Sequence, residues 1–185
     1  MTSKRDRSDD FDAFVKNQQP TEQGARIDWV QERERWLGDL NALYEKIESF
    51  LAKYIEGGTI KLEYGEMSLN EENIGAYTAR RMLLRIGRQE ITLTPVGTLL
   101  IGARGRVDVV GPAGRTRFVL VNSQASRPQI KMTVRIAGQP EPPPKAEPRE
   151  EIKWAWKIAT SAPTIQYIEL TQESLFQVLM EVANG

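Results

Sequence analysis

Apolar residues recur at helical spacing between residues 26 and 56. They form three rows with a seven-residue repeat: Val30, Leu37, Tyr44 and Leu51; Leu40, Ile47 and Tyr54; and Trp36, Leu43 and Phe50. Three rows in seven make a broad stripe, which is typical of a helix packed on a sheet, because a coiled-coil seam is narrower. The pattern therefore predicts a long core helix that Gly57-Gly58 ends, and a dimerising helix is the alternative.

Between residues 59 and 170 the period of the apolar positions changes to two, which predicts strands. The strand-like segments are 59–67, 81–86, 91–93, 99–101, 106–110, 115–121, 129–136, 152–158 and 164–170, and residues 68–73 and 87–90 are predicted turns. The short connections favour antiparallel pairing, because parallel strands need long crossovers. Thr171 then caps a predicted helix over 172–183, whose buried face holds Leu175, Phe176, Leu179 and Val182.

These elements predict an α+β fold with a long N-terminal helix, an antiparallel meander of about seven to nine strands and a C-terminal helix. Residues 26–185 are expected to form a single domain, with a proline-rich loop at 138–151, and residues 1–25 a polar N-terminal arm. The order of elements is similar to that of pleckstrin-homology-like domains. That resemblance implies a curved sheet or split barrel capped by the last helix.

The stretch TLLIGARGRVDVVGPAGRTRFVLV, residues 98–121, has glycines after an apolar run, as a phosphate-binding loop would. However, strand-like alternation follows these glycines, and no Lys-Ser or Lys-Thr pair is present, so we predict a hairpin. In its expected register Asp108 faces Arg117, and the two form a cross-strand ion pair. One side carries core residues (Val107, Val109, Phe118 and Leu120), and the other carries Arg106, Asp108, Arg115 and Arg117.

The net charge of zero hides a segregation of charge along the chain. Residues 76–137 hold 11 basic and 2 acidic side chains, whereas residues 1–75 hold 10 and 16, and residues 138–185 hold 4 and 7. Ten of the 11 central cations are arginine, which prefers carboxylate and phosphate partners. The candidate basic face consists of Arg104, Arg106, Arg115 and Arg117. Acidic parts of the same chain, an acidic protein or nucleic acid could neutralise it, and the lack of aromatic stacking platforms disfavours nucleic acid.

The composition removes whole classes of chemistry. The chain has no cysteine and no histidine, which excludes disulfides, Ser-His-Asp triads and zinc sites built on these ligands. No catalytic residue, metal site or cofactor is predicted, and an enzyme would need Glu90, Asp108 and Glu169 to converge in one cleft. No apolar run approaches the ~20 residues of a membrane span, and no secretory signal is seen, so we expect a cytoplasmic protein.

Two further features have a functional and a structural interpretation. Pro140, Pro143 and Lys145 fit a pattern that docks on aromatic grooves, although a spacer or hairpin loop is favoured. Trp154 and Trp156 share one face of a strand, where they could stack a ligand, but core packing is the more common role.

The sequence thus favours a non-enzymatic interaction domain that binds an acidic protein partner or associates with itself through the long helix or a strand edge. The alternative is an anion or nucleic-acid binder that uses the basic face. A carboxylate- or metal-dependent enzyme is the third hypothesis.

Overall fold

The structure is a computed structural model that describes residues 28–98, 103–128 and 152–184. Its elements, in chain order, are α2 (Trp29–Glu56), β1 (Ile60–Glu71), β2 (Gly75–Ile86), β3 (Gln89–Gly97), β4 (Gly105–Val110), β5 (Arg115–Asn122), β6 (Trp154–Ala159), β7 (Tyr167–Glu169) and α3 (Gln172–Asn184). This order confirms the predicted α+β fold, with a strand number at the lower end of the expected range.

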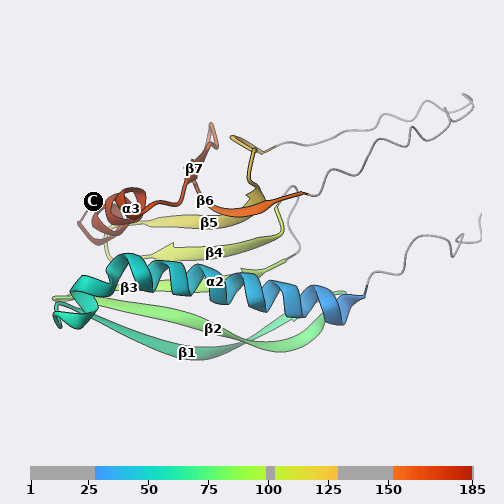
Figure 1. The fold of residues 1–185 in the computed structure, drawn as a ribbon, viewed down its shortest axis with the longest axis horizontal. Coiled ribbons are helices and arrows are strands. Elements are labelled where there is room, and N and C mark those ends of the chain that lie inside the picture. Colours follow the sequence, from blue (N-terminus) through green and yellow to red (C-terminus); the bar gives the residue numbers. More distant parts are fainter. Residues whose placement is uncertain (1–27, 99–102, 129–151, 185) are drawn as a thin grey trace, which may run out of the picture.

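The seven strands form one open antiparallel sheet in which each strand pairs with its neighbour in sequence. β1 and β7 are therefore the two edges of the sheet. Helix α2 runs along the sheet, and α3 lies near the end at which α2 finishes (Figure 1). Both helices and the sheet contribute to one apolar core, so they cover the same face. We call the opposite face the outer face.

Helix α2 begins after a capping aspartate and ends at the predicted Gly57-Gly58 pair. The side chain of Asp28 accepts hydrogen bonds from the backbone N–H groups of Val30 and Gln31, both at 3.1 Å, and so caps the first turn. Gly58 has a φ of 70°, which suits the residue that follows a helix end. The buried residues of the helix are drawn from all three predicted rows: Trp36, Leu40, Leu43, Tyr44, Ile47 and Leu51. The core-helix prediction is confirmed.

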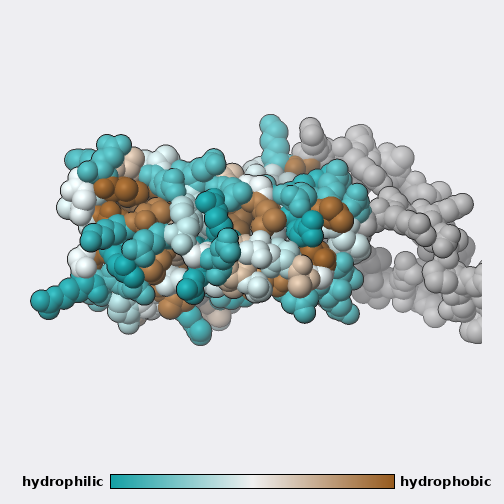
Figure 2. Space-filling view, turned by 90° about the horizontal axis from the view of Figure 1, so that it is seen from below, coloured by the Kyte–Doolittle hydropathy of each residue, from teal (hydrophilic) through white to brown (hydrophobic). Residues whose placement is uncertain are grey.

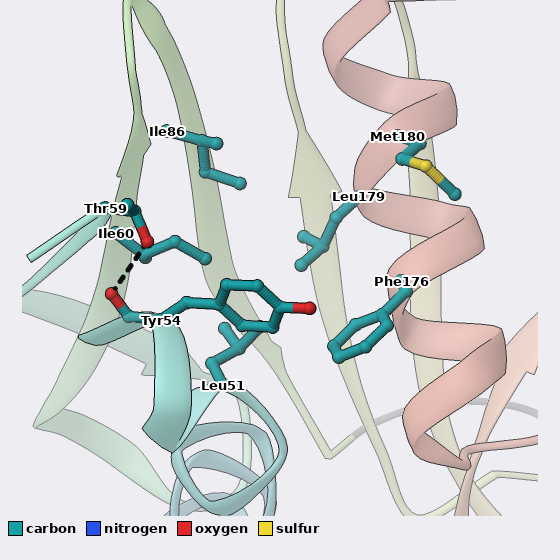
Figure 3. A pocket seen from close by; sticks show the side chains of 8 residues that line it. All are labelled: Leu51, Tyr54, Thr59, Ile60, Ile86, Phe176, Leu179 and Met180. Carbon is teal, nitrogen blue, oxygen red and sulfur yellow. Dashed lines mark hydrogen bonds between the residues drawn. The ribbon is translucent and has the colours of Figure 1, made fainter. Parts of the chain in front are cut away.

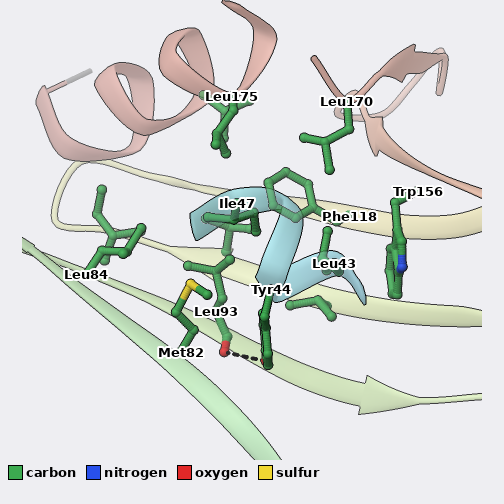
Figure 4. Packing of buried hydrophobic residues seen from close by; sticks show 14 of the residues in the cluster. Leu43, Tyr44, Ile47, Met82, Leu84, Leu93, Phe118, Trp156, Leu170 and Leu175 are labelled. Carbon is green, nitrogen blue, oxygen red and sulfur yellow. Dashed lines mark hydrogen bonds between the residues drawn. The ribbon is translucent and has the colours of Figure 1, made fainter. Parts of the chain in front are cut away.

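Side chains from α2, the sheet and α3 interlock in the core (Figure 4). The hydroxyl group of Tyr44 donates a hydrogen bond to the backbone carbonyl of Arg80 at 2.9 Å, which satisfies a polar atom inside the core. Gly105 lies against Trp36 so closely that an added Cβ would be 2.2 Å from the indole ring. Only glycine fits at this position of β4.

The structure corrects two predicted boundaries. The turn predicted at 68–73 covers residues 72–74 instead, because β1 continues to Glu71 and pairs with β2 at every residue from Ile60 on. Met67 and Leu69 are half-buried between exposed polar neighbours, so this stretch alternates as a strand does. The last strand covers 167–169 only, instead of 164–170. The predicted arm at 1–25, the strand segments at 99–101 and 129–136 and the loop at 138–151 lie outside the described residues.

Candidate functional site: an arginine-bearing hollow

The β4–β5 hairpin has the predicted register. Asp108 stands opposite Arg117, and Val110 stands opposite Arg115. The four side chains assigned to the core are at most 2% exposed: Val107, Val109, Phe118 and Leu120. Because side chains alternate between the two faces of a strand, the arginines of this hairpin lie on the outer face.

The ion pair in this hairpin differs from the prediction. Asp108 pairs with Arg106, two residues away on the same strand, and not with Arg117 on the neighbouring strand. Both guanidinium donors of Arg106 reach the carboxylate, with Nε to Oδ1 at 2.6 Å and Nη2 to Oδ2 at 2.8 Å. A two-point contact of this kind is the preferred geometry between guanidinium and carboxylate groups. The single acidic side chain of the hairpin is thus already engaged.

The hairpin and the start of the β6–β7 loop enclose a polar hollow of about 440 Å³, which we call the arginine hollow. Its lining consists of Arg106, Asp108, Arg115, Thr116, Arg117, Ala159, Ser161 and Ala162. Among the described residues, no carboxylate lies within ion-pair distance of Arg115 or Arg117. Three arginines and one aspartate give the lining a net charge of +2, so the hollow attracts anions.

Arg104, the fourth member of the predicted basic face, lies apart from this hollow. Its guanidinium group is 3.4 Å from a carboxylate oxygen of Glu32 on α2 and 5.4 Å from the ring centre of Trp154. Burial raises the pKa of the nearby Asp39, Arg104 partly offsets that rise, and Glu32 adds to it. The structure therefore brings three of the four predicted arginines together and places Arg104 against the N-terminal half of α2.

Other central arginines have partners within the chain. Arg85 lies between Glu63 and Glu90, at 2.9 Å and 3.2 Å. Arg80 donates a hydrogen bond to Asn41 at 2.8 Å, and its guanidinium carbon is 4.4 Å from the ring centre of Tyr64. Acidic partners thus neutralise Arg85, Arg104 and Arg106, whereas Arg115 and Arg117 have no such partner within residues 28–98, 103–128 and 152–184.

The three carboxylates of the enzyme hypothesis occupy three different strands and have separate cationic partners. Glu90 pairs with Arg85 at 3.2 Å, and Asp108 pairs with Arg106 at 2.6 Å. Glu169 pairs with Lys157, also at 2.6 Å. Within residues 28–98, 103–128 and 152–184, no group of three acidic side chains is close enough to hold a metal ion.

The two tryptophans of β6 have different environments, although they share one strand face. Trp156 is 8% exposed, packs 6.1 Å from Trp36 between ring centres and donates its indole N–H to the carbonyl of Asp39 at 2.9 Å. Trp154 is 38% exposed at the end of the strand. The proline-rich docking pattern of Pro140, Pro143 and Lys145 lies outside the described residues.

The sequence analysis did not identify Ala159 and Tyr167, which lie beside Arg117 on β6 and β7. The strand registers place Arg117 opposite Ala159 and Ala159 opposite Tyr167, so these three residues form a row across the outer face of β5, β6 and β7. The β6–β7 loop beside this row contains a cis peptide bond between Ala162 and Pro163. No local pattern pairs β5 with β6, because 31 residues separate them in the sequence.

A second, apolar groove of about 310 Å³ opens where the end of α2 approaches α3 (Figure 3). Tyr54 and Phe176 face each other across it in an edge-to-face contact, with ring centres 5.7 Å apart. Met180 on its rim is 61% exposed. We call this depression the apolar groove. Its lining consists of Leu51, Tyr54, Thr59, Ile60, Ile86, Phe176, Leu179 and Met180.

The groove end of the molecule also shows exposed apolar surface in space-filling view. Seen from below, the surface is mostly hydrophilic, with separate apolar patches, one of them broad and at the left end where α2 finishes (Figure 2). Patches of this kind often mark interaction sites on soluble domains. Among the described residues, no helix is both long and apolar enough to cross a membrane.

Comparison with known proteins adds no relative to this picture: no protein-family model matches the chain, and searches of curated proteins and of solved structures give no significant match.

Proposed function

We propose that this chain is a binding domain that recognises an acidic protein partner through the arginine hollow. The observation that carries the proposal is the lack of a carboxylate partner for Arg115 and Arg117 among the described residues, although both line a concave site. A guanidinium group binds a carboxylate through two parallel hydrogen bonds, and such charge-assisted bonds contribute about 1.5–3 kcal/mol each. Complementary charge also speeds association.

The composition of the hollow favours acidic side chains over nucleic acid as its ligand. Its floor and rim are small residues, Ala159, Ser161 and Ala162, and it has no aromatic side chain on which a base could stack. Asp108 contributes a negative charge that repels a continuous phosphate backbone more than it repels a few spaced carboxylates. Nucleic-acid binding through the same face remains the alternative that the experiment below distinguishes.

The test is a titration of a fluorescent peptide of about twenty residues, rich in glutamate, at an ionic strength of about 50 mM, where surface charges act strongly. We expect saturable binding that weakens as salt rises. The double variant Arg115→Glu/Arg117→Glu should weaken binding by at least ~30-fold, because repulsion replaces two charge-assisted contacts. The matched control Lys61→Glu/Arg88→Glu changes the net charge equally at two exposed positions outside the hollow and should bind almost as the wild type does.

A single-stranded oligonucleotide of similar length is the second arm of the experiment. If it binds more tightly than the peptide and loses binding in the Arg115→Glu/Arg117→Glu variant, the nucleic-acid alternative replaces the proposal. If neither ligand binds, or if the two double variants lose binding equally, the arginine hollow is not the binding site.

Self-association is the second candidate function, and the apolar groove favours it. The groove adjoins the start of β1, a 12-residue edge strand, at Thr59 and Ile60. An open edge can pair with a second copy, and an adjacent apolar surface would strengthen that contact. Light scattering over a range of concentrations should show a dimer that Met180→Glu weakens and Val30→Glu, at an exposed apolar residue outside the groove, does not. A monomer at every concentration rules this function out.

A further inference from the structure

A smaller hollow of about 210 Å³ lies directly beside the arginine hollow, and we call it the tyrosine hollow. Its lining consists of Ala103, Arg106, Arg117, Val119, Pro128, Ala159, Ile165 and Tyr167. Three of these residues, Arg106, Arg117 and Ala159, also line the arginine hollow. The two depressions are therefore continuous, one mainly charged and the other mainly apolar, with the same guanidinium groups at their boundary.

The strand registers explain why the two hollows meet at Ala159. Arg117, Ala159 and Tyr167 stand opposite one another on β5, β6 and β7, so a small side chain lies between two long ones. The long neighbours rise on both sides and leave a depression above the alanine. Burial raises the pKa of Tyr167 and the positive charge of Arg117 opposes that rise, which is consistent with a hydroxyl group close to this arginine.

The apolar side of the tyrosine hollow is held in place by a buried lysine. Lys157, which is only 4% exposed, donates hydrogen bonds to the carbonyls of Ser123 at 2.7 Å and Ala125 at 3.0 Å. It also pairs with Glu169 at 2.6 Å, and the backbone N–H of Tyr167 donates to the carbonyl of Ser126 at 2.9 Å. These contacts tie the segment after β5 to β6 and β7, so the depression is formed before any ligand arrives.

We infer that the partner segment carries an aliphatic or aromatic side chain beside its acidic residues, and that this side chain enters the tyrosine hollow while the carboxylates bind Arg115 and Arg117. The inference rests on the proposed function. Charge complementarity selects this occupant, because Arg117 lines both hollows and has no carboxylate partner among the described residues, and an uncharged apolar ligand would leave it so. A purely acidic segment would leave the partly exposed side chains of Ile165 and Tyr167 in contact with water.

The experiment compares two peptides of equal length and charge that differ at one position between glutamates, which holds leucine in one and serine in the other. We expect the leucine peptide to bind wild-type protein about tenfold more tightly, the typical gain from burying one such side chain. Ile165→Ser should remove most of this difference while it leaves the affinity of the serine peptide unchanged. Tyr167→Ser should also reduce the leucine advantage, and it serves as a second variant if Ile165→Ser folds poorly.

The outcomes separate this inference from the proposed function. If both peptides bind equally and Arg115→Glu/Arg117→Glu weakens both, the acidic-partner function holds and the inference is wrong. If neither peptide binds, the proposed function fails first. If the leucine advantage persists in Ile165→Ser and Tyr167→Ser but disappears in Met180→Glu, the leucine binds the apolar groove, and the inference is overturned.

Discussion

Arginine residues on the two halves of the outer face differ in whether they have ion-pair partners. On the β1–β3 half, Arg85 lies between Glu63 and Glu90 and makes an ion pair with each. On the β4–β6 half, Arg115 and Arg117 have no such partner among the described residues. Arg85 is therefore neutralised within the chain, whereas Arg115 and Arg117 have no carboxylate partner in the part of the chain that the structure describes. Local charge balance is a matter of strand neighbours and not of the number of acidic residues in the chain.

The strand registers account for this difference. Glu90 stands directly opposite Arg85 across the β2–β3 pair, so their side chains meet without further adjustment. Arg117 has Asp108 on one side and Ala159 on the other, and Asp108 is already bound by Arg106. The β4–β6 half thus combines two guanidinium groups that have no carboxylate partner among the described residues with a small residue that leaves room for a ligand.

Neutralising one arginine in each half should separate binding from stability, and this is the largest expected effect. Arg117→Gln should weaken acidic-peptide binding by ~10–100-fold through loss of charge-assisted hydrogen bonds, with little change in the free energy of unfolding. Arg85→Gln should lower the free energy of unfolding by at most ~2 kcal/mol, since each exposed ion pair contributes ~0–1 kcal/mol, and should leave binding intact. Peptide titration and urea unfolding of both variants measure the two effects. Weaker peptide binding in Arg85→Gln together with unchanged binding in Arg117→Gln would contradict this assignment.

Filling the floor of the hollow should weaken binding without any change in charge. Ala159→Leu places a larger side chain between Arg117 and Tyr167, where both hollows meet, and we expect about tenfold weaker binding of an acidic peptide through lost shape fit. A circular-dichroism spectrum like that of the wild type is the control for folding. Unchanged affinity in a folded Ala159→Leu protein would show that the ligand does not enter the depression.

Removing the one acid of the hollow should strengthen binding. Asp108→Asn releases the guanidinium group of Arg106 from its two-point contact and raises the local charge by one. We expect about fivefold tighter binding, which corresponds to ~1 kcal/mol for one additional charge near a solvated surface. The same titration detects it, and the gain should shrink as salt is added. Weaker binding in Asp108→Asn would indicate that Asp108 positions Arg106 for the ligand.

The smallest expected effect concerns Asp39, a residue of α2 that lies near Arg104. Burial raises the pKa of the adjacent Asp39 from its ordinary value of 3.8, so the folded protein holds that proton more tightly than the unfolded chain does. This contribution to stability is fully present below the unfolded pKa and is lost as pH rises through the folded pKa. Asp39→Asn should therefore unfold at a slightly higher temperature than the wild type at pH 7, and the difference should shrink towards pH 4. A constant difference at both pH values would contradict this.

The sequence predicted the hairpin at the centre of the site better than it predicted the site itself. The strict alternation in 106–110 and the short turn after it predicted that Asp108 stands opposite Arg117. They also predicted that the arginines of the hairpin lie on the outer face. It did not identify the ion-pair partner of Asp108, because Arg106 and Arg117 are both within reach on the same face, and side-chain geometry decides between them.

The remainder of the site depends on contacts between distant parts of the sequence. β5 pairs with β6 across 31 intervening residues, so no local pattern places Ala159 and Tyr167 beside Arg117. The turn predicted at 68–73 was placed too early for a different reason, since the turn covers residues 72–74. Ser68 and Asn70 have the composition of a turn, but the half-buried Met67 and Leu69 beside them continue the alternation of an edge strand.

The most direct test of the central claim is nuclear magnetic resonance of the arginine side-chain Nε–Hε groups during titration with an acidic peptide. The resonances of Arg115 and Arg117 should move together and saturate, while that of Arg85, held by Glu63 and Glu90, should stay in place. Movement of Arg85 with Arg115 and Arg117 unmoved, or no movement of any arginine at saturating peptide, would contradict the account.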